Sequence, residues 1–222
     1  MRVSVVQFAG TNCEYDTKYA FEKLGCKVDI IWHKNKTLPK ADLVVLPGGF
    51  SYGDALRSGA IARFSPIVED VIKHANRGGK VLGICNGFQI LLESNLLEGA
   101  MMRNDSLHFI SKFHYLRVEN SENDFLKNFK VSDILNIPIA HAEGNYYIDS
   151  DGLKSLKDNG QILLKYCDKD GNIKNPNGSV ESIAGICNKN KNVFGLMPHP
   201  ERAIEEILGS SDGIKMLKSL IG

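Results

Sequence analysis

The sequence lacks a charge excess of either sign and lacks any long apolar run. Its 222 residues carry 27 Lys and Arg against 26 Asp and Glu, a formal net charge of +1. No basic field is therefore available to gather nucleic acid or anionic lipid. The apolar run in residues 1–10 breaks at Gly10 and is too short for a signal segment or a membrane span. We expect a cytosolic protein with no nucleic-acid or membrane partner.

Cysteine is scarce and shows no pairing pattern. An odd number of residues without a C-x-x-C pair argues against a disulfide scaffold and against a zinc clip. No segment spells the G-x-x-x-x-G-K-[ST] of nucleoside triphosphate sites. The sequence thus predicts a reduced protein with no metal and no cofactor bound to this chain. Its five cysteines are Cys13, Cys26, Cys85, Cys167 and Cys187.

Short β-rich runs alternate with helical stretches in the first half of the chain. Strands are expected at residues 2–8, 27–32, 42–46 and 80–84. Helices are expected at residues 13–24, with Asn12 as N-cap, and from Pro66 to about Arg77, with Ser65 as N-cap. This order is typical of an α/β fold with a flavodoxin-like, doubly wound, mainly parallel sheet and helices on both faces. Ligands of such sheets bind at the carboxyl ends of the strands.

The second half is less regular. Residues 106–119 and 136–148 resemble antiparallel strands, and residues 168–179 form a polar, glycine-rich loop whose role the sequence leaves open. No internal repeat, low-complexity tract or linker interrupts the chain. We therefore expect a single domain over residues 1–222.

One cysteine lies between a predicted strand and a predicted helix. Gly83 and Gly87 flank Cys85 as G-x-C-x-G, the cysteine form of a nucleophile elbow. Small residues at both positions allow a tight, strained turn that holds the side chain at the end of the strand. The helix N-terminus favours the thiolate, which is the form that attacks. Cys85 is thus the predicted nucleophile, three other cysteines are expected in packing roles, and Cys13, after the first strand, stays undecided.

A thiolate nucleophile needs a partner that protonates the leaving nitrogen, and histidine does this near neutral pH. His199 lies in MPHPER, after an apolar run. Pro200 biases it toward an extended backbone, in which residues two apart point the same way, so Glu201 can orient the imidazole. Taken alone, Pro-His-Pro is better explained as a stiff turn with a solvated carboxylate, but the elbow at Cys85 weakens this alternative. Four histidines are expected at the surface or in packing: His33, His74, His108 and His114.

The segment LPGGF, residues 46–50, follows an apolar strand and contains two adjacent glycines. Its backbone N–H groups can approach a substrate without an intervening side chain and stabilise charge on a carbonyl oxygen. We predict an oxyanion hole from the N–H groups of Gly49 and Asn86. A plain turn and a phosphate cradle are the alternatives.

The motifs GICNGFQIL, LPGGFSYGD, HAEGNYY and MPHPER together resemble class I, or triad, glutamine amidotransferases. GGFSYGD, RSGAIAR and PHPER resemble the glutaminase subunits of phosphoribosylformylglycinamidine synthase within that class. The resemblance implies hydrolysis of L-glutamine to glutamate and ammonia through a thioester on Cys85, with His199 as acid and base and Glu201 as its orienter. It also implies a substrate-binding set of Gln89, Phe50, Gly48, His141 and Glu143.

Making an amidine from an amide requires ATP, for which this chain has no recognisable site. The resemblance places ATP and Mg on a separate large synthetase subunit, with a small third subunit in the same complex. Three other hypotheses stay open: a glutaminase serving another acceptor, such as a guanylate or pyridoxal phosphate pathway; a partner-independent cysteine-elbow hydrolase; and an inactive regulatory module. An intact Cys85, His199 and Glu201 argues against the last.

Overall fold

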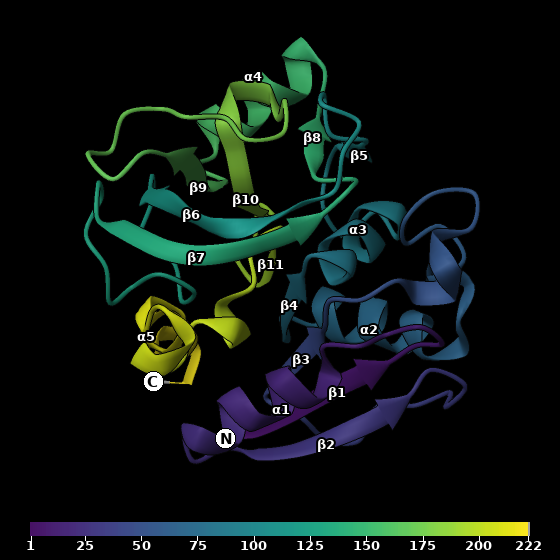
Figure 1. The fold of residues 1–222 in the computed structure, drawn as a ribbon. Coiled ribbons are helices and arrows are strands. Elements are labelled where there is room, and N and C mark those ends of the chain that lie inside the picture. Colours follow the sequence, from purple (N-terminus) through teal and green to yellow (C-terminus); the bar gives the residue numbers. More distant parts are fainter. Residues whose placement is uncertain (222) are drawn as a thin grey trace.

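The computed structural model describes residues 1–221, in which a nine-stranded sheet runs through the molecule (Figure 1). The order across this sheet is β2-β1-β3-β4-β11-β10-β9-β6-β7. Its strands are β1 (Arg2–Gln7), β2 (Lys27–Trp32), β3 (Leu43–Leu46), β4 (Lys80–Ile84), β6 (Ile110–Val118), β7 (Ile134–His141), β9 (Ile162–Cys167), β10 (Ile183–Cys187) and β11 (Val193–Leu196). Two further strands, β5 (Ala100–Met102) and β8 (Asn145–Tyr147), form a separate antiparallel pair.

The first half of this sheet is parallel. Strands β2, β1, β3, β4 and β11 all run the same way, in the order of flavodoxin-like folds. Both faces of the central strands are covered, and all four residues of β3 are buried, which is why this strand reads as a continuous apolar run rather than an alternating one. The loops after β1, β3, β4 and β11 consequently meet at one edge of the sheet.

The second half of the sheet is antiparallel, from β11 across to β7. Strands β6 and β7 confirm the antiparallel strands expected in these two segments, and they pair with each other, but residues 136–148 do not form one strand. The chain leaves β7 at His141, turns, and contributes β8 to the pair with β5, which packs beside a helix of the parallel half (Figure 1). The turn between β7 and β8 therefore lies next to the nucleophile region.

The helices are α1 (Glu14–Lys23), α2 (Pro66–Asn76), α3 (Asn86–Glu93), α4 (Ser150–Asp158) and α5 (Asp212–Ile221). Helices α1 and α5, from opposite ends of the chain, pack against each other (Figure 1). Helix α2 begins at Pro66 after Ser65, as predicted. The predicted cap of α1 is wrong, because Cys13 occupies the N-cap position and no side chain caps it. Among residues 1–221, no helix combines the length and apolar content needed to cross a membrane.

Candidate active site

Cys85 stands at the N-terminus of α3, directly after β4, in a strained backbone conformation. Its φ of 51° and ψ of −107° lie in a region that non-glycine residues rarely adopt. The flanking positions require glycine because a side chain there would clash with the backbone. A Cβ on Gly87 would lie 1.8 Å from the Leu46 carbonyl oxygen, and a Cβ on Gly83 would lie 2.7 Å from the Gly87 oxygen. The sharp turn expected from G-x-C-x-G is present, and it holds a largely buried thiol whose Sγ lies 3.6 Å from the Ala140 oxygen.

His199 and Glu201 form a buried pair beside this thiol. The Nδ1 of His199 lies 2.7 Å from Glu201 Oε1, while its backbone N–H donates to Pro138 O at 2.8 Å and so ties the loop after β11 to β7. Glu201 reaches the imidazole from a 3₁₀ turn, η4 (Pro200–Arg202), rather than from the extended backbone that the sequence suggested. The Nδ1 of His199 is thus held by Glu201, while Nε2 has no hydrogen-bond partner among residues 1–221.

The charge state of His199 is set by opposing effects. Burial disfavours the imidazolium, but the negative charges of Glu201 and then of Cys85 outweigh burial and hold the pKa of His199 well above its ordinary value. The pair can therefore hold the proton that the leaving nitrogen requires.

Cys13, left undecided by the sequence, also belongs to this cluster. Its thiol is buried, accepts a hydrogen bond from Arg202 at 2.9 Å, and lies so close to His199 that a Cβ on Gly48 would meet both side chains within 3.0 Å. Burial raises the pKa of Cys13, and the nearby His199 only partly offsets this. Only the fold brings Cys13, the N-cap residue of α1, together with Arg202 of η4 at this place.

The group Cys13, His199 and Glu201 is the one set among residues 1–221 that offers three metal-ligating atoms, all within 4.8 Å. The 2.7 Å between His199 Nδ1 and Glu201 Oε1 is a hydrogen-bond distance, shorter than the separation of two ligands around a tetrahedral ion. The Arg202 guanidinium on Cys13 Sγ also repels cations. These atoms fit an acid-base cluster better than a metal site.

The loop after β3 lies against the elbow, where the oxyanion hole was predicted. Gly49 has a φ of 147°, and a Cβ there would lie 2.7 Å from the Thr11 Cα, so the loop follows the β1 loop closely. The Asn86 side chain links the two segments, because its Oδ1 accepts a hydrogen bond from the Ser51 N–H at 3.1 Å. The loop and the elbow are thus held side by side, as an oxyanion hole requires.

Gln89 lies one helical turn beyond the nucleophile and is buried. Its Oε1 accepts from Asn86 Nδ2 at 2.9 Å, and its Nε2 donates to the Glu143 backbone oxygen at 2.7 Å. Glu143 lies in the turn between β7 and β8. The sequence-predicted residues Gln89, Asn86 and Glu143 are therefore brought together on one side of Cys85.

The ring of His141, which the resemblance placed in the substrate-binding set, forms hydrogen bonds within the protein. The ring is buried, with Nδ1 3.0 Å from Asn104 Oδ1 and Nε2 3.5 Å from Asn177 Nδ2. Burial, followed by the charge of His199, lowers the pKa of His141 to about 4. Asn177 comes from the polar loop 168–179 and also donates to Gly144 O at 2.7 Å. The loop 168–179 therefore holds the turn between β7 and β8, which in turn contacts Gln89. The composition of the loop does not indicate this role.

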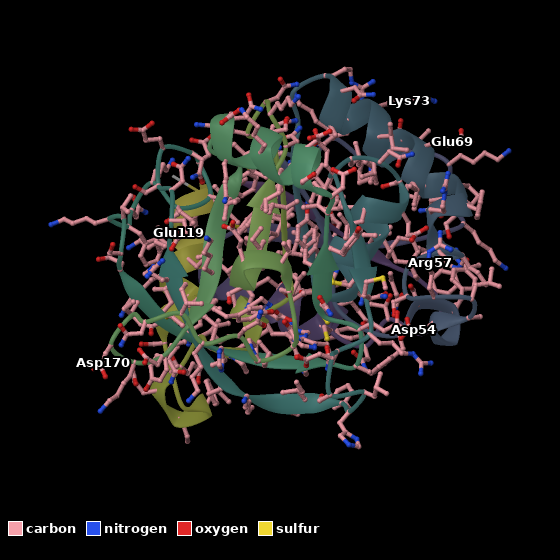
Figure 2. The ribbon with its side chains drawn as sticks, turned by 90° about the horizontal axis from the view of Figure 1, so that it is seen from above. Asp54, Arg57, Glu69, Lys73, Glu119 and Asp170 are labelled. Atoms are coloured by element: carbon pink, nitrogen blue, oxygen red, sulfur yellow. The ribbon has the colours of Figure 1, made fainter. Side chains whose placement is uncertain are left out.

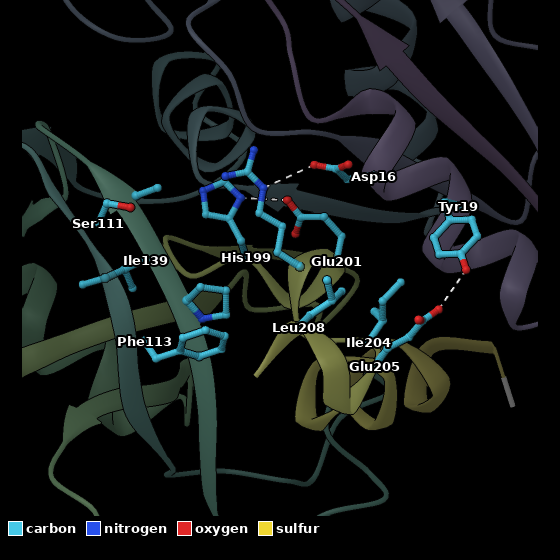
Figure 3. A pocket seen from close by; sticks show the side chains of 13 residues that line it. Asp16, Tyr19, Ser111, Phe113, Ile139, His199, Glu201, Ile204, Glu205 and Leu208 are labelled. Atoms are coloured by element: carbon cyan, nitrogen blue, oxygen red, sulfur yellow. Dashed lines mark hydrogen bonds and ion pairs between the residues drawn. The ribbon is translucent and has the colours of Figure 1, made fainter. Parts of the chain in front are cut away.

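Two hollows border the cluster. A small cavity of about 70 Å³ contains the thiol and the predicted donor loop; it is lined by Asn12, Cys13, Gly49, Phe50, Cys85, Phe109, Ala140, His199 and Arg202. A wider pocket of about 570 Å³ is lined by His199 and Glu201 as well (Figure 3). Neither Cys85 nor Gly49 lines the wide pocket, so the small cavity is the place for a reacting amide.

A family profile identifies the chain. The CobB/CobQ-like glutamine amidotransferase domain matches residues 1–213. The chain belongs to this family. The chain has the fold class that the alternation of strands and helices predicted. The family match also confirms the resemblance that the motifs indicated.

Similar proteins cover this amidotransferase from end to end. It is 65% identical over 222 residues to phosphoribosylformylglycinamidine synthase subunit PurQ of Sulfurimonas denitrificans, covering 100% of this chain and 99% of the relative. The protein of the same name from Campylobacter jejuni is 60% identical over 221 residues, covering 100% and 96%.

Solved structures give the same fold. A chain in the structure of PurLQS from Thermotoga maritima has a TM-score of 0.89 and 43% identity, covering 99% of this amidotransferase and 97% of that chain. A second protein of Thermotoga maritima, described as a glutamine amidotransferase, has a TM-score of 0.64 at 15% identity, covering 100% and 96%. At that identity the likeness shows the fold alone.

Proposed function

We propose that this chain is the glutaminase subunit of phosphoribosylformylglycinamidine synthase and acts in the cytosol. One observation carries the chemistry: Cys85, in a left-handed backbone at a helix N-terminus, shares a cavity with His199, whose Nδ1 is held by Glu201. A strained nucleophile, a buried base and an orienting carboxylate form the constellation of covalent amide hydrolysis.

The reaction proceeds in two halves. The Cys85 thiolate attacks the side-chain amide carbon of L-glutamine, and His199 gives its proton to the leaving nitrogen, so that ammonia departs and a glutamyl thioester remains. His199 then takes a proton from water, whose oxygen attacks the thioester. Glutamate leaves and the thiolate is restored. Glu201 stabilises the imidazolium that is present in both halves.

The carbonyl oxygen carries negative charge during each half. The N–H groups of Gly49 and Asn86 are the proposed donors, and the contact between Ser51 and Asn86 keeps them in register. Such a donor typically contributes a factor of about a hundred or more to the rate. Gln89, Phe50, Gly48 and Glu143 are proposed to surround the rest of the substrate.

The acceptor of the ammonia is assigned from the relatives. Subunits named PurQ are 58% to 65% identical to this chain, and a structural neighbour comes from a complex called PurLQS. We infer that a large synthetase subunit, with ATP and Mg, receives the ammonia through a protected passage and converts formylglycinamide ribonucleotide to formylglycinamidine ribonucleotide. A small third subunit completes the complex. No cofactor is proposed for this chain.

The test is Cys85→Ala in the reconstituted complex, supplied either with glutamine or with an ammonium salt. Alanine cannot form the thioester, so glutamine-dependent synthesis is expected to disappear while ammonia-dependent synthesis persists. Product formation is measured in both assays.

The matched control is Cys26→Ala, which removes another buried thiol far from the elbow. This variant is expected to keep both activities. Glutamine-dependent product from Cys85→Ala would overturn the assignment of the nucleophile. Loss of ammonia-dependent synthesis would instead show that assembly had failed, and native mass spectrometry of the complex detects that directly.

A further inference from the structure

The loop after β3 has a strained backbone beyond Gly49. It passes through a 3₁₀ turn, η1 (Ser51–Asp54), in which three consecutive residues are left-handed: Tyr52 with a φ of 55°, Gly53 with 67° and Asp54 with 53°. Glycine adopts this conformation readily, but a bulky tyrosine rarely does. Contacts with the rest of the protein must therefore hold the turn in place.

The near end of this loop is tied to the reacting centre. The Ser51 N–H donates to Asn86 Oδ1 at 3.1 Å, and Asn86 is the residue after the nucleophile. Gly49, whose N–H is a proposed oxyanion donor, lies only three positions before Tyr52. A displacement of Tyr52 therefore changes the direction of the Gly49 N–H, because only two residues separate them.

The far end of the loop is held through the Tyr52 hydroxyl. Its Oη lies 2.9 Å from His33 Nδ1 and 3.1 Å from Ser65 Oγ, and the latter two atoms are 3.2 Å apart. His33 follows β2 directly, and Ser65 precedes α2. The side chains of Tyr52, His33 and Ser65 thus form a polar triangle that joins the loop to a strand at the edge of the sheet and to a helix.

His33 is a fixed anchor in this polar triangle. The residue is 4% exposed, and its ring packs edge-on against Trp32 with 4.3 Å between the ring centroids. Its backbone N–H donates to the Gln7 oxygen at 2.9 Å, and its backbone oxygen accepts from the Ile67 N–H at 3.3 Å. Strand β1 and helix α2 therefore hold the His33 backbone from two sides.

Ser65 departs from its local role to join the polar triangle. It occupies the N-cap position of α2, where a serine side chain normally accepts a hydrogen bond from a backbone N–H of the first helical turn. That bond is absent at Ser65, and its hydroxyl lies against Tyr52 and His33 instead. Natural proteins break such local preferences mainly at functional sites. The start of α2 thus has a role beyond the stability of the helix.

The polar triangle does not border the reacting thiol. None of its three residues lines the small cavity at Cys85. The turn that it holds ends at Asp54, on the side of the molecule where Glu69 and Lys73 mark α2 and opposite to Asp170 (Figure 2). The three residues therefore act on the reaction through the backbone of the loop, as positioning residues, and not through contact with the substrate.

We propose that Tyr52, His33 and Ser65 align the oxyanion donor of Gly49 by holding η1 in its left-handed form. The inference rests on the proposed function and extends it to residues outside the cavity. A donor that is fixed in advance stabilises charge on the carbonyl oxygen without rearranging during the reaction. A loop that relaxes toward ordinary backbone angles turns this N–H away. The polar triangle thus stabilises the transition state more than it strengthens the binding of glutamine.

The first experiment is Tyr52→Phe in the reconstituted complex, which keeps the ring and removes the hydroxyl. We expect kcat for glutamine-dependent synthesis to fall by about tenfold or more with little change in KM, because a misaligned donor weakens only the transition state. Ammonia-dependent synthesis is expected to stay unchanged. Ser65→Ala, which leaves the sequence of the loop intact, is expected to show the same split between kcat and KM.

The matched control is Tyr115→Phe, which removes a hydroxyl from β6 in the antiparallel half of the sheet, where the residue is 37% exposed. Its kcat and KM are expected to equal those of the unsubstituted complex. An unchanged kcat in Tyr52→Phe would overturn the proposal.

An aldehyde analogue of glutamine, glutamate γ-semialdehyde, separates alignment of the donor from general damage to the site. The Cys85 sulfur bonds to the aldehyde carbon, the C=O double bond becomes a single bond, and the oxygen takes the charge or a proton in the oxyanion hole. Its Ki is expected to rise in Tyr52→Phe by the factor by which kcat/KM for glutamine falls. In a complex that carries Cys85→Ala, calorimetry is expected to give the same Kd for glutamine with and without Tyr52→Phe.

These two measurements also distinguish the inference from the proposed function. An unchanged Ki would refute alignment of the donor by the polar triangle. A Kd for glutamine that weakens as much as the Ki would refute it too, because it would indicate a purely structural role. Selective weakening of the aldehyde in a complex whose unsubstituted form does not hydrolyse glutamine would contradict the proposed function alone.

Discussion

Glu201 holds His199 through a single oxygen. Its Oε1 lies 2.7 Å from Nδ1, while Oε2 is buried and has no partner among residues 1–221. A carboxylate with so little other hydrogen bonding is stabilised mainly when the imidazole of His199 is positively charged. Its contribution is thus concentrated in the steps of the reaction where His199 is charged.

Glu201→Gln is therefore expected to lower kcat by about a hundredfold or more with little change in KM for glutamine. The side chain introduced at position 201 has the same shape and still forms hydrogen bonds. It lacks the negative charge that raises the pKa of His199. Steady-state kinetics of the reconstituted complex measure both constants. Glu205→Gln, which removes a half-buried carboxylate bound to Lys23 and Tyr19, serves as control. An unchanged kcat would assign the orienting role to another carboxylate.

Asp54 provides a pH-dependent measure of electrostatic strain in the folded protein. Burial and the charge of Glu143 raise its pKa from 3.8 to about 6 in the folded protein. The folded state therefore binds this proton more tightly than the unfolded state does, and the free energy of unfolding falls as pH rises from about 4 to about 6. Above that window the penalty is complete, and below it the penalty is absent.

Asp54→Asn is accordingly expected to be more stable than the unsubstituted chain at about pH 8, by about 1 to 3 kcal/mol, at 1.36 kcal/mol for each pKa unit. At about pH 4 the gain is expected to vanish, because Asp54 is then protonated. Urea unfolding at both pH values measures the difference, with Asp170→Asn as control. A gain of equal size at both pH values would exclude electrostatic strain as its cause.

At the scale of elements, the elbow depends on how closely α3 approaches β3. The Leu46 oxygen lies 1.8 Å from the position that a Cβ of residue 87 would take, so the end of β3 and the first turn of α3 touch through backbone. This contact places the donor loop after β3 beside Cys85. The strain at Cys85 is maintained by packing on both sides rather than by its own preferences.

Gly87→Ala is expected to destabilise the fold by about 3 kcal/mol or more, because neither backbone can yield without moving the elbow. Gly78→Ala is the matched control, since Gly78 has a φ of 86° but no atom within 4 Å of an added Cβ. It is expected to cost only about 1 to 2 kcal/mol, the strain of a left-handed alanine. Denaturation midpoints of the two variants compare these costs. Equal losses would show that backbone strain, and not the contact with β3, dominates.

At the scale of the whole molecule, the small size of the cavity at Cys85 points to control of the activity by a partner. About 70 Å³ holds roughly two waters, far less than glutamine, and two of its aromatic wall residues, Phe50 and Phe109, are 45% and 51% exposed. A protein that packs against these exposed walls can select an open, aligned state in proportion to its differential affinity for the two states.

The isolated chain is therefore expected to be a poor glutaminase, and assembly with the synthetase is expected to raise glutamate release by on the order of tenfold or more. The assay measures glutamate from the chain alone, with the synthetase, and with synthetase, acceptor and nucleotide. Full activity of the chain by itself would contradict control by a partner and would favour a free-standing amidase.

The sequence by itself determined the parts of this protein that depend on local order along the chain. Apolar runs followed by glycines predicted the parallel strands and the elbow at Cys85, because a tight turn between a strand and a helix has few sequence solutions. MPHPER identified His199 and Glu201 for the same reason, since the two lie only two positions apart. The motifs also identified the amidotransferase family.

Tertiary structure alone decided which distant segments meet at the nucleophile. Cys13 joins the cluster only because β1 and β3 are adjacent in the sheet, and Asn177 reaches Gly144 only because the polar loop folds back over the turn after β7. The pairing of Asp54 with Glu143 likewise comes from segments far apart in the chain. The secondary-structure preferences of single residues do not predict such contacts, because the free energy of these contacts arises from packing and charge across the folded sheet.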